Sequence, residues 1–353
     1  MLLGLAQAKY SSIPILIFYI FILTSPMKLQ TAKLFWKDLV ISPKELRLDT
    51  LRCGQSFRWK QVNGHWASVL HGRLVVLKET PATILYGYDK DLDEQAILEI
   101  RDYFQLDKVS LEKCYKDWSK IDSNFSKKSI HFAGIRILRQ DPWENLISFI
   151  CSSNNNITRI SQMIDKLCKR FGKKVGTLDE TEFHDFPTLD QFVSHDHTES
   201  TLRELGFGYR AKYIANTAKK IKSDHAPLGE LWLHTLRSVT YPEAKASLMQ
   251  LQGVGPKVAD CVCLMSLDHS EAIPVDTHVW QIALRDYGFN KRGKTLTSQL
   301  YIQVGDHFRS LFGKYAGWAH SVLFTADLKS FSPQKRKLED VKLEEKREIL
   351  KTP

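Results

Sequence analysis

The chain has 353 residues, enough for one to three compact domains, and 43% hydrophobic with 25% charged residues is the composition of a soluble globular protein. A formal net charge of +10 favours a polyanionic partner, with nucleic acid ahead of a membrane surface. The six cysteines form no CxxC pair, so a zinc knuckle is unsupported, and their scattered positions fit a reducing compartment.

Residues 1–27 hold an apolar run from Ile13 to Leu23, broken only by a proline and a tyrosine. The run is shorter than the roughly 20 residues that a spanning helix needs. It resembles a signal-peptide core or a mitochondrial leader, although Lys9 is the only charge in the segment. We interpret residues 1–27 as an apolar leader or a gene-model extension, with Met27 as another start. A membrane anchor is the remaining alternative.

Residues 28–140 are predicted to form an N-terminal domain, an antiparallel sheet with helices. Within residues 44–90, Phe57 and Trp59 alternate with polar neighbours as in a strand. The apolar runs that follow are separated by two hairpin signals, Asn63-Gly64 and His71-Gly72. Residues 94–125 are predicted to be helical.

Residues 141–330 are predicted to form a helical domain. An apolar helix from Leu146 to Cys151 ends at three asparagines, Asn154 to Asn156, which suit a turn and the cap of the amphipathic helix that follows. The polar residues 172–200 are predicted to be loops with short helices. A charged tail, residues 331–353, contains Lys335-Arg336-Lys337, which is either a nuclear address or part of a solvated tail.

Residues 242–266 have the pattern of a helix, a tight hairpin and a second helix. Pro242 suits a first helical turn, Gly253 ends that helix, and Pro256 opens the next one. Gly253 and Gly255 are expected to take positive φ angles and to let the backbone approach another surface. Unpartnered backbone N–H groups at such a hairpin suit a phosphate.

Lys257 lies in the first turn of the second helix, where the helix dipole and burial disfavour an ammonium and favour a free amine that can attack carbon. Asp276 is predicted to cap a later helix, which keeps its carboxylate ionised and able to stabilise positive charge. A lysine nucleophile beside a fixed aspartate suits cleavage of a glycosidic bond through a covalent imine. The residues alone leave a second interpretation open, in which Lys257 and the hairpin only grip nucleic-acid backbone.

Taken together, the motifs resemble the helix-hairpin-helix-Gly/Pro-Asp DNA glycosylase superfamily and, within it, the eukaryotic 8-oxoguanine DNA glycosylases. The resemblance extends roughly from Lys44 to Ser330 and covers five separate stretches, residues 53–59, 151–159, 205–213, 253–278 and 315–324. It implies an α+β, mostly α fold with a TBP-like N-terminal antiparallel β-sheet subdomain and a helical glycosylase domain, and duplex DNA in the cleft between them. The implied enzyme is a bifunctional DNA glycosylase and AP lyase. It excises 8-oxoguanine opposite cytosine through a Lys257 Schiff base and β-elimination, with Asp276 assisting.

The resemblance also implies a pocket for the extruded base. The carbonyl of Gly54 would accept a hydrogen bond from N7–H of 8-oxoguanine and repel the N7 lone pair of guanine. One misplaced buried polar pair costs about 1–3 kcal/mol, which is enough to discriminate between the two bases. Cys261 and Phe324 would sandwich the base. The chain departs from the family at His320, where glutamine is expected, and a neutral histidine offers one donor and one acceptor in a different geometry.

For the rest of the DNA, the resemblance implies that Asn154 fills the space left by the flipped nucleotide and that Arg159 and Arg210 read the opposite cytosine. Filling matters because a base taken from the stack costs a few kcal/mol. Tyr209 would wedge between bases, and the remaining DNA contacts would come from the hairpin glycines and a phosphate-binding histidine, Gly253, Gly255 and His278.

No metal or other cofactor is expected. Some relatives carry a four-cysteine iron–sulfur cluster after the catalytic domain, but no cysteine follows Cys263. The expected partner is damaged double-stranded DNA, bound by a monomer without a stable membrane partner, in the nucleus and with the mitochondrion as a second location. The rival functions are a related glycosylase with another lesion preference and a non-catalytic DNA-binding module.

Overall fold

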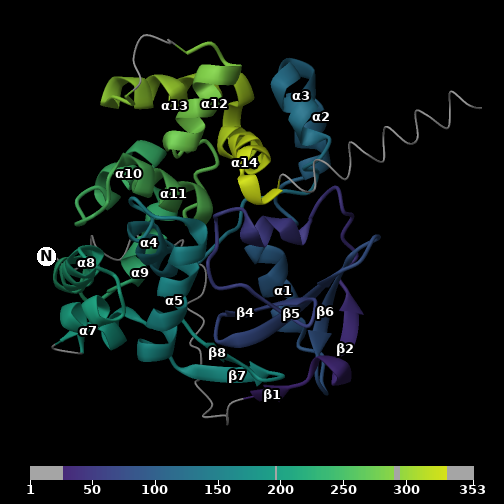
Figure 1. The fold of residues 1–353 in the computed structure, drawn as a ribbon, viewed down its shortest axis with the longest axis vertical. Helices are drawn as coiled ribbons and strands as arrows, with labels where there is room; N and C mark the ends of the chain where they lie inside the picture. Colours follow the sequence, from purple (N-terminus) through teal and green to yellow (C-terminus); the bar gives the residue numbers. More distant parts are fainter. Residues whose placement is uncertain (1–26, 195–196, 290–294, 332–353) are drawn as a thin grey trace, which may run out of the picture.

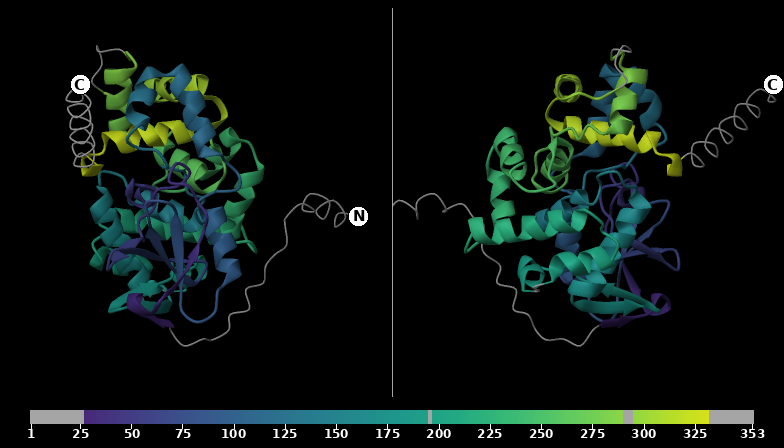
Figure 2. Two further views of the ribbon diagram at one scale, coloured as in Figure 1. Left: turned by 90° about the vertical axis from the view of Figure 1, so that its right-hand side faces the viewer. Right: turned by 60° about the vertical axis from the view of Figure 1, so that its left-hand side comes forward.

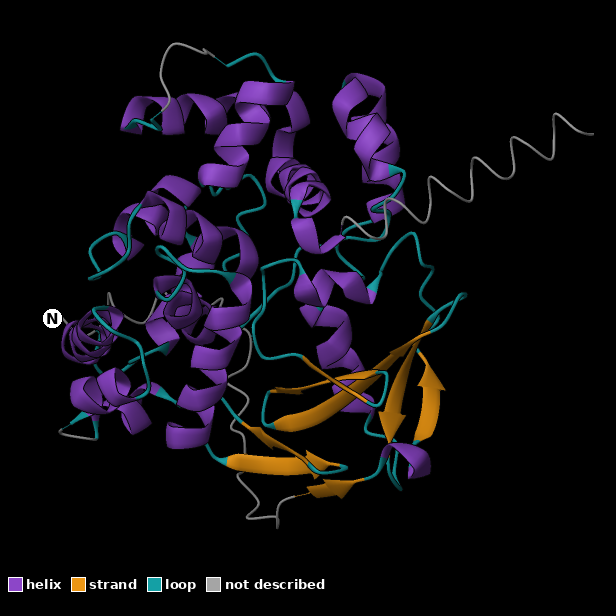
Figure 3. Ribbon diagram, in the orientation of Figure 1, coloured by secondary structure: helices purple, strands orange, loops and turns teal. Residues whose placement is uncertain are grey.

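The computed structural model describes residues 27–194, 197–289 and 295–331. The leader, up to residue 26, and the basic run Lys335-Arg336-Lys337 lie outside these ranges, so the interpretations given to them stay predictions. Strands gather at one end of the molecule and helices make up the rest, as Figure 3 shows. The predicted α+β, mostly α architecture is therefore confirmed. None of the helices in the described ranges combines the length and the apolarity needed to cross a membrane.

An antiparallel sheet of five strands forms the N-terminal part, in the order β2-β6-β5-β4-β3. Its strands are β2 (Phe35–Asp38), β3 (Lys60–Val62), β4 (His65–Leu70), β5 (Arg73–Glu79) and β6 (Ile84–Tyr88). Both predicted hairpins are confirmed: Asn63 and Gly64 have φ of 48° and 78°, and the next turn, His71-Gly72, has 48° and 75°. Two successive positive φ angles are what a two-residue type I′ turn requires.

The strand predicted around Phe57 and Trp59 is wrong, because β3 begins only at Lys60 and a 3₁₀ helix, Leu48–Arg52, with loop residues precedes it. Both aromatic side chains are nevertheless buried. Phe57 joins the core of the helical part, whereas Trp59 joins the core beneath the five-stranded sheet. The alternation in the sequence thus reflects a loop that buries Phe57 and Trp59 in two different cores, and not the two faces of a strand.

A second sheet was not predicted. It contains β1 (Met27–Leu29), β7 (Lys174–Leu178) and β8 (Thr181–His184), with β1 parallel to β7 and β7 antiparallel to β8. Residues 172–200 therefore begin with a hairpin, and only their second half has the predicted short helices, α6 (Leu189–Val193) and α7 (Thr198–Glu204). Met27 and Gly176 pair although they are far apart in sequence. The polar composition of residues 172–200 therefore does not indicate that they join a sheet.

The helical part surrounds α4, whose residues other than Glu144 are buried. Helices α12 to α14 lie at the end of the molecule opposite the sheets, and α10 and α11 lie between them and α4 (Figures 1 and 2). The other helices are α1 (Glu94–Tyr103), α2 (Leu111–Ile121), α3 (Ser123–Ser129), α4 (Pro142–Ile150), α5 (Ile157–Phe171), α8 (Arg210–Asp224), α9 (Leu231–Thr235), α10 (Tyr241–Leu248), α11 (Pro256–Ser266), α12 (Thr277–Asp286), α13 (Ser298–Phe312) and α14 (Ala316–Asp327). Of these, α11 packs directly on α4.

One arginine joins the N-terminal loops to this helical part. Arg136 has no exposed surface, and its guanidinium donates to the carbonyls of Phe104, Gln105 and Val109 at 2.6–2.7 Å and to the carbonyl and carboxylate of Glu45 at 3.0 and 2.9 Å. All five N–H donors of the fork therefore have acceptors. The segment that leads into α4 is thus fixed from both sides.

Candidate active site

The hairpin between α10 and α11 presents an open helix N-terminus. Gly253 has φ of +80°, and a Cβ there would lie 2.8 Å from the ring of Tyr213 on α8, so this position needs glycine twice over. The prediction of positive φ at Gly255 is wrong, since it has φ of −90° and ψ of −179° as the N-cap of α11. Its Cβ position is open space, and no side chain of the described residues caps the helix. The N–H groups of this first turn can therefore meet an anion.

Lys257 follows in that first turn and points at the end of α4. Its Nζ donates to Ser152 Oγ at 3.1 Å and lies 4.9 Å from the ring centre of Phe149. The Ser152 hydroxyl in turn donates to the Phe149 carbonyl at 2.7 Å, which leaves its oxygen to accept from the amine. Ser152 was part of the sequence motif but was given no role, because nothing in its spacing indicates that it meets Lys257.

Asp276 is the N-cap of α12, as predicted, and its Oδ1 accepts from the Val279 N–H at 2.9 Å. It makes no direct ion pair with Lys257 within the described residues, but both charges act on the Cys261 thiol. Burial raises the pKa of Cys261 to about 12, while Lys257 opposes the shift and Asp276 adds to it. The thiol therefore keeps its proton, and Lys257 faces a neutral sulfur and a nearby carboxylate. Lys257 and Asp276 thus act on the same buried thiol.

The four predicted base-pocket residues come from three remote segments. Gly54 has φ of +85°, and its Cβ position lies 3.7 Å from Phe324 Cε1, so the loop of residues 53–59 touches α14 here. His320 stacks on Phe324, with ring centres 6.4 Å apart and planes at 29°. His278 meets the same Phe324 ring edge-on at 5.9 Å. Phe324 is thus the common neighbour of Gly54, His320 and His278.

His320 is the unusual member of this group. It is 5% exposed, and neither ring nitrogen has a hydrogen-bond partner among the described residues. Burial lowers the pKa of His320 to about 4, against a smaller opposing effect of the Asp276 charge. The ring is therefore neutral at physiological pH and holds one donor and one acceptor that a base can use.

A second group lies at the turn between α4 and α5. Asn154 has φ of +46°. The Arg210 guanidinium donates to the carbonyls of Ser153 and Asn154, and it covers the Tyr209 ring at 4.5 Å. The Tyr209 hydroxyl donates to the same Ser153 carbonyl at 3.2 Å, with the side chain 46% exposed. The structure thus brings Asn154, Tyr209 and Arg210 together. Arg159 is exposed on the first turn of α5, and its side chain makes no hydrogen bond or ion pair with these three residues.

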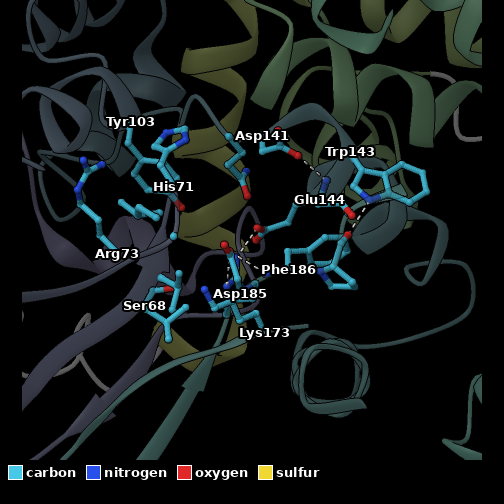
Figure 4. A pocket seen from close by; sticks show the side chains of 18 of the residues that line it. Ser68, His71, Arg73, Tyr103, Asp141, Trp143, Glu144, Lys173, Asp185 and Phe186 are labelled. Carbon is cyan, nitrogen blue, oxygen red and sulfur yellow. Dashed lines mark hydrogen bonds and ion pairs between the residues drawn. The ribbon is translucent and has the colours of Figure 1, made fainter. Parts of the chain in front are cut away.

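A large cavity of about 720 Å³ lies elsewhere, at the N-terminal end of α4 (Figure 4). Four of its charged side chains form two ion pairs: Arg58 contacts Glu144 at 2.5 Å, and Arg73 contacts Asp93 at 2.9 Å. Burial raises the pKa of Glu144, and Arg58 opposes that shift. Since Lys257 lies at the other end of α4, this cavity is separate from the candidate site. In the described ranges, no three His, Cys, Asp or Glu side chains gather as metal ligands.

Two family models match adjacent parts of the chain, and both describe DNA repair proteins. Residues 38–146 match the family described as 8-oxoguanine DNA glycosylase, N-terminal domain, and residues 147–303 match the HhH-GPD superfamily of base excision DNA repair proteins. N-glycosylase/DNA lyase OGG1 of Arabidopsis thaliana is 41% identical over 317 residues, which is 86% of each chain. N-glycosylase/DNA lyase of Saccharomyces cerevisiae is 40% identical over 325 residues, 82% of this chain and 85% of the relative.

A solved structure agrees. The Clostridium acetobutylicum 8-oxoguanine glycosylase/lyase, in complex with double-stranded DNA containing cytosine opposite 8-oxoguanine, superimposes with a TM-score of 0.69 at 30% identity, over 80% of this chain and 91% of that one. The sequence match with the Arabidopsis relative covers 86% of both proteins, and the fold match covers 80% of this chain. The chain therefore belongs to the 8-oxoguanine DNA glycosylase family of the HhH-GPD superfamily.

Proposed function

We propose that this protein excises 8-oxoguanine opposite cytosine from duplex DNA and then cleaves the strand, as a bifunctional DNA glycosylase and AP lyase of base excision repair. The observation that carries the proposal is the Lys257 amine, which donates to Ser152 and acts, like the Asp276 carboxylate, on the buried Cys261 thiol. Relatives 40–41% identical bear the name N-glycosylase/DNA lyase, and this pairing of activities requires an amine nucleophile.

Recognition uses the two clusters around the site. The extruded base stacks on Phe324, the Gly54 carbonyl tests for a proton on N7, and His320 meets the pairing edge. Asn154 occupies the place of the flipped nucleotide, Tyr209 wedges into the stack, and the opposite cytosine is read by two arginines, Arg159 and Arg210. The hairpin from Gly253 to Gly255, together with His278, holds the backbone phosphates. A base left out of the stack would otherwise cost a few kcal/mol.

The chemistry follows from the lysine. The Lys257 nitrogen forms a bond to C1′ of the deoxyribose as the bond from C1′ to N9 breaks and the base leaves with the electron pair. The bond from C1′ to the ring oxygen then breaks as a proton passes from the nitrogen to that oxygen, and the protonated imine that forms acidifies the C2′ proton. Removal of that proton breaks the bond from C3′ to its phosphate oxygen and cuts the strand. Asp276 stabilises the positive charge that develops on the sugar.

Borohydride trapping on a duplex with 8-oxoguanine opposite cytosine tests the nucleophile. The protein should form a covalent adduct, Lys257→Gln should form none, and the exposed control Lys314→Gln should trap like the unchanged protein. An adduct with Lys257→Gln would show that another amine attacks the sugar.

A second variant tests the carboxylate. Asparagine caps helices as well as aspartate does, so Asp276→Asn should keep α12 and remove only the charge. Base release should slow by about 100-fold or more while DNA binding is largely kept, because the charge acts in the transition state. An unchanged release rate would remove Asp276 from the mechanism.

His320 gives one specific reason to test other lesions, since its donor and acceptor differ in placement from those of glutamine. Release rates on a panel of oxidised purine, oxidised pyrimidine and alkylated purine duplexes should be highest with 8-oxoguanine opposite cytosine. A non-catalytic DNA-binding module would instead bind with steep salt dependence and release no base.

The cellular location is a separate proposal. We place the protein in the nucleus through Lys335-Arg336-Lys337, and in the mitochondrion when residues 1–27 are translated. Fractionation of cells that express the chain from Met1 or from Met27 checks both parts. The same signal in both compartments from either start would contradict the role given to the leader.

A further inference from the structure

The helix that carries Lys257 also carries a buried carboxylate for which the mechanism above has no use. Asp260 lies one turn after Lys257 and next to Cys261, and the residue has no exposed surface. Its Oδ1 accepts from the Tyr241 hydroxyl at 2.6 Å, and its Oδ2 lies 2.8 Å from Lys245 Nζ. Both partners belong to α10, so they join the two helices of the hairpin. An ion pair with one further hydrogen bond already compensates much of the cost of burying this charge.

A third partner reaches the same carboxylate from a different helix. Tyr301 of α13 donates its hydroxyl proton to Asp260 Oδ2. Burial and the Asp260 charge both raise the pKa of Tyr301, so the phenol keeps that proton. The Tyr301 oxygen in turn accepts from the backbone N–H of Val275 at 3.4 Å. A hydroxyl that donates to a carboxylate becomes a better acceptor, so the two bonds support each other.

This relay ends beside the second catalytic residue. Val275 immediately precedes Asp276, so its amide is the last donor of the connecting loop before the α12 cap, and Pro274 before it has no N–H to offer. The loop between α11 and α12 has no helix or strand of its own. The chain from Val275 N–H through Tyr301 O–H to Asp260 therefore links the backbone that carries Asp276 to the helix that carries Lys257.

We propose that Tyr301 and Asp260 are positioning residues, which hold the Asp276 carboxylate in place relative to the Lys257 amine. The inference rests on the proposed function, because the distance between the Asp276 carboxylate and the Lys257 amine matters only if both groups act in catalysis. Misplacing a catalytic group by about 1 Å can cost about 100-fold in rate. The bond from Val275 is long, so its loss should cost less, about tenfold.

Single-turnover base release from the 8-oxoguanine duplex, with enzyme in excess, compares two variants that each remove one hydroxyl from the same carboxylate. Tyr301→Phe should slow base release about tenfold while leaving affinity for a duplex with a non-cleavable abasic analogue unchanged. Tyr241→Phe is the matched control, because its hydroxyl bonds to Asp260 from α10 and, within the described chain, to no residue of the loop that ends at Asp276. It should release base within about twofold of the unchanged protein.

A second measurement separates the relay from the activity. Hydrogen exchange of the Val275 amide should accelerate in Tyr301→Phe and not in Tyr241→Phe, whether or not the protein excises 8-oxoguanine. Unchanged exchange in Tyr301→Phe would overturn the relay. Faster exchange with full excision, or an equal slowing in both variants, would overturn the positioning role. Failure of the proposed function would show differently, as no base release and no trapped adduct with the unchanged protein.

Discussion

Replacing His320 by glutamine should make the folded state more resistant to acid. The pKa of His320 is lowered to about 4 by burial, from an ordinary value of 6.5. Below pH 6.5 the unfolded chain takes up a proton at this ring, while the folded protein does not until about pH 4. The unfolded state then binds more protons, so stability falls as the pH falls. Glutamine has no such proton to bind.

The magnitude follows from the two pKa values. Their full difference corresponds to about 3 kcal/mol of lost stability at low pH, and about 2 kcal/mol of it should be lost between about pH 7.5 and pH 5. The Asp276 charge is already included, because it acts against the desolvation of the ring. Other carboxyl groups and histidines also titrate in this range, and comparing variants cancels their contribution.

Urea unfolding at the two pH values measures this difference. The unchanged protein should lose about 2 kcal/mol more than His320→Gln on acidification, with both variants similar at neutral pH. The exposed His197 is the control: His197→Gln should lose as much as the unchanged protein. Equal acid sensitivity of the unchanged protein and His320→Gln would refute the view that the ring is buried and neutral.

Three further substitutions test the frame of the site. Arg136→Lys should destabilise the protein by about 3 kcal/mol in urea unfolding, because three donors cannot replace the five of the buried fork. Gly253→Ala should cost about 2 kcal/mol, since φ of +80° and the Tyr213 ring both exclude a Cβ. Gly255→Ala should change stability by less than about 0.5 kcal/mol, because its Cβ enters open space. It should still weaken duplex binding in a titration, where a phosphate would approach the bare backbone; unchanged affinity would argue against that contact.

Local signals in the sequence predicted the helix starts of the site well, whereas α10 ends at Leu248 and not next to Gly253 as predicted. Asp276 at the start of α12, Pro256 at the start of α11 and Asn156 at the start of α5 all occupy the predicted first-turn or cap positions. The reason is that capping involves residues within one turn of each other, so the sequence contains both partners. The helix starts next to Lys257 and at Asp276 could therefore be predicted from the chain alone, although the φ angle of Gly255 could not.

Signals that depend on remote partners failed. The β7–β8 hairpin has a polar sequence, and it becomes part of a sheet because β1 pairs with β7 and Leu178 and Phe183 enter a shared core. The positive φ predicted for Gly255 was wrong for a different reason. Glycine was taken as a sign of unusual backbone angles, but Gly255 has angles that any residue can adopt. What glycine provides at this position is a bare backbone that faces open space, where a phosphate can approach it.

The base pocket marks the limit of what spacing can predict. Gly54, Cys261 and Phe324 lie on a loop and two helices, and only the fold places the first beside the third. The resemblance supplied these residues, but it supplied no reason for His320, Asp260 or Tyr301. Two orphan nitrogens of His320 and a three-partner carboxylate at Asp260 are costly to bury, and a protein tolerates such groups where they serve a site. Asp260 lies one turn after Lys257 on α11, and the Asp276 charge acts on the His320 ring, so both groups belong to the surroundings of the proposed catalytic residues.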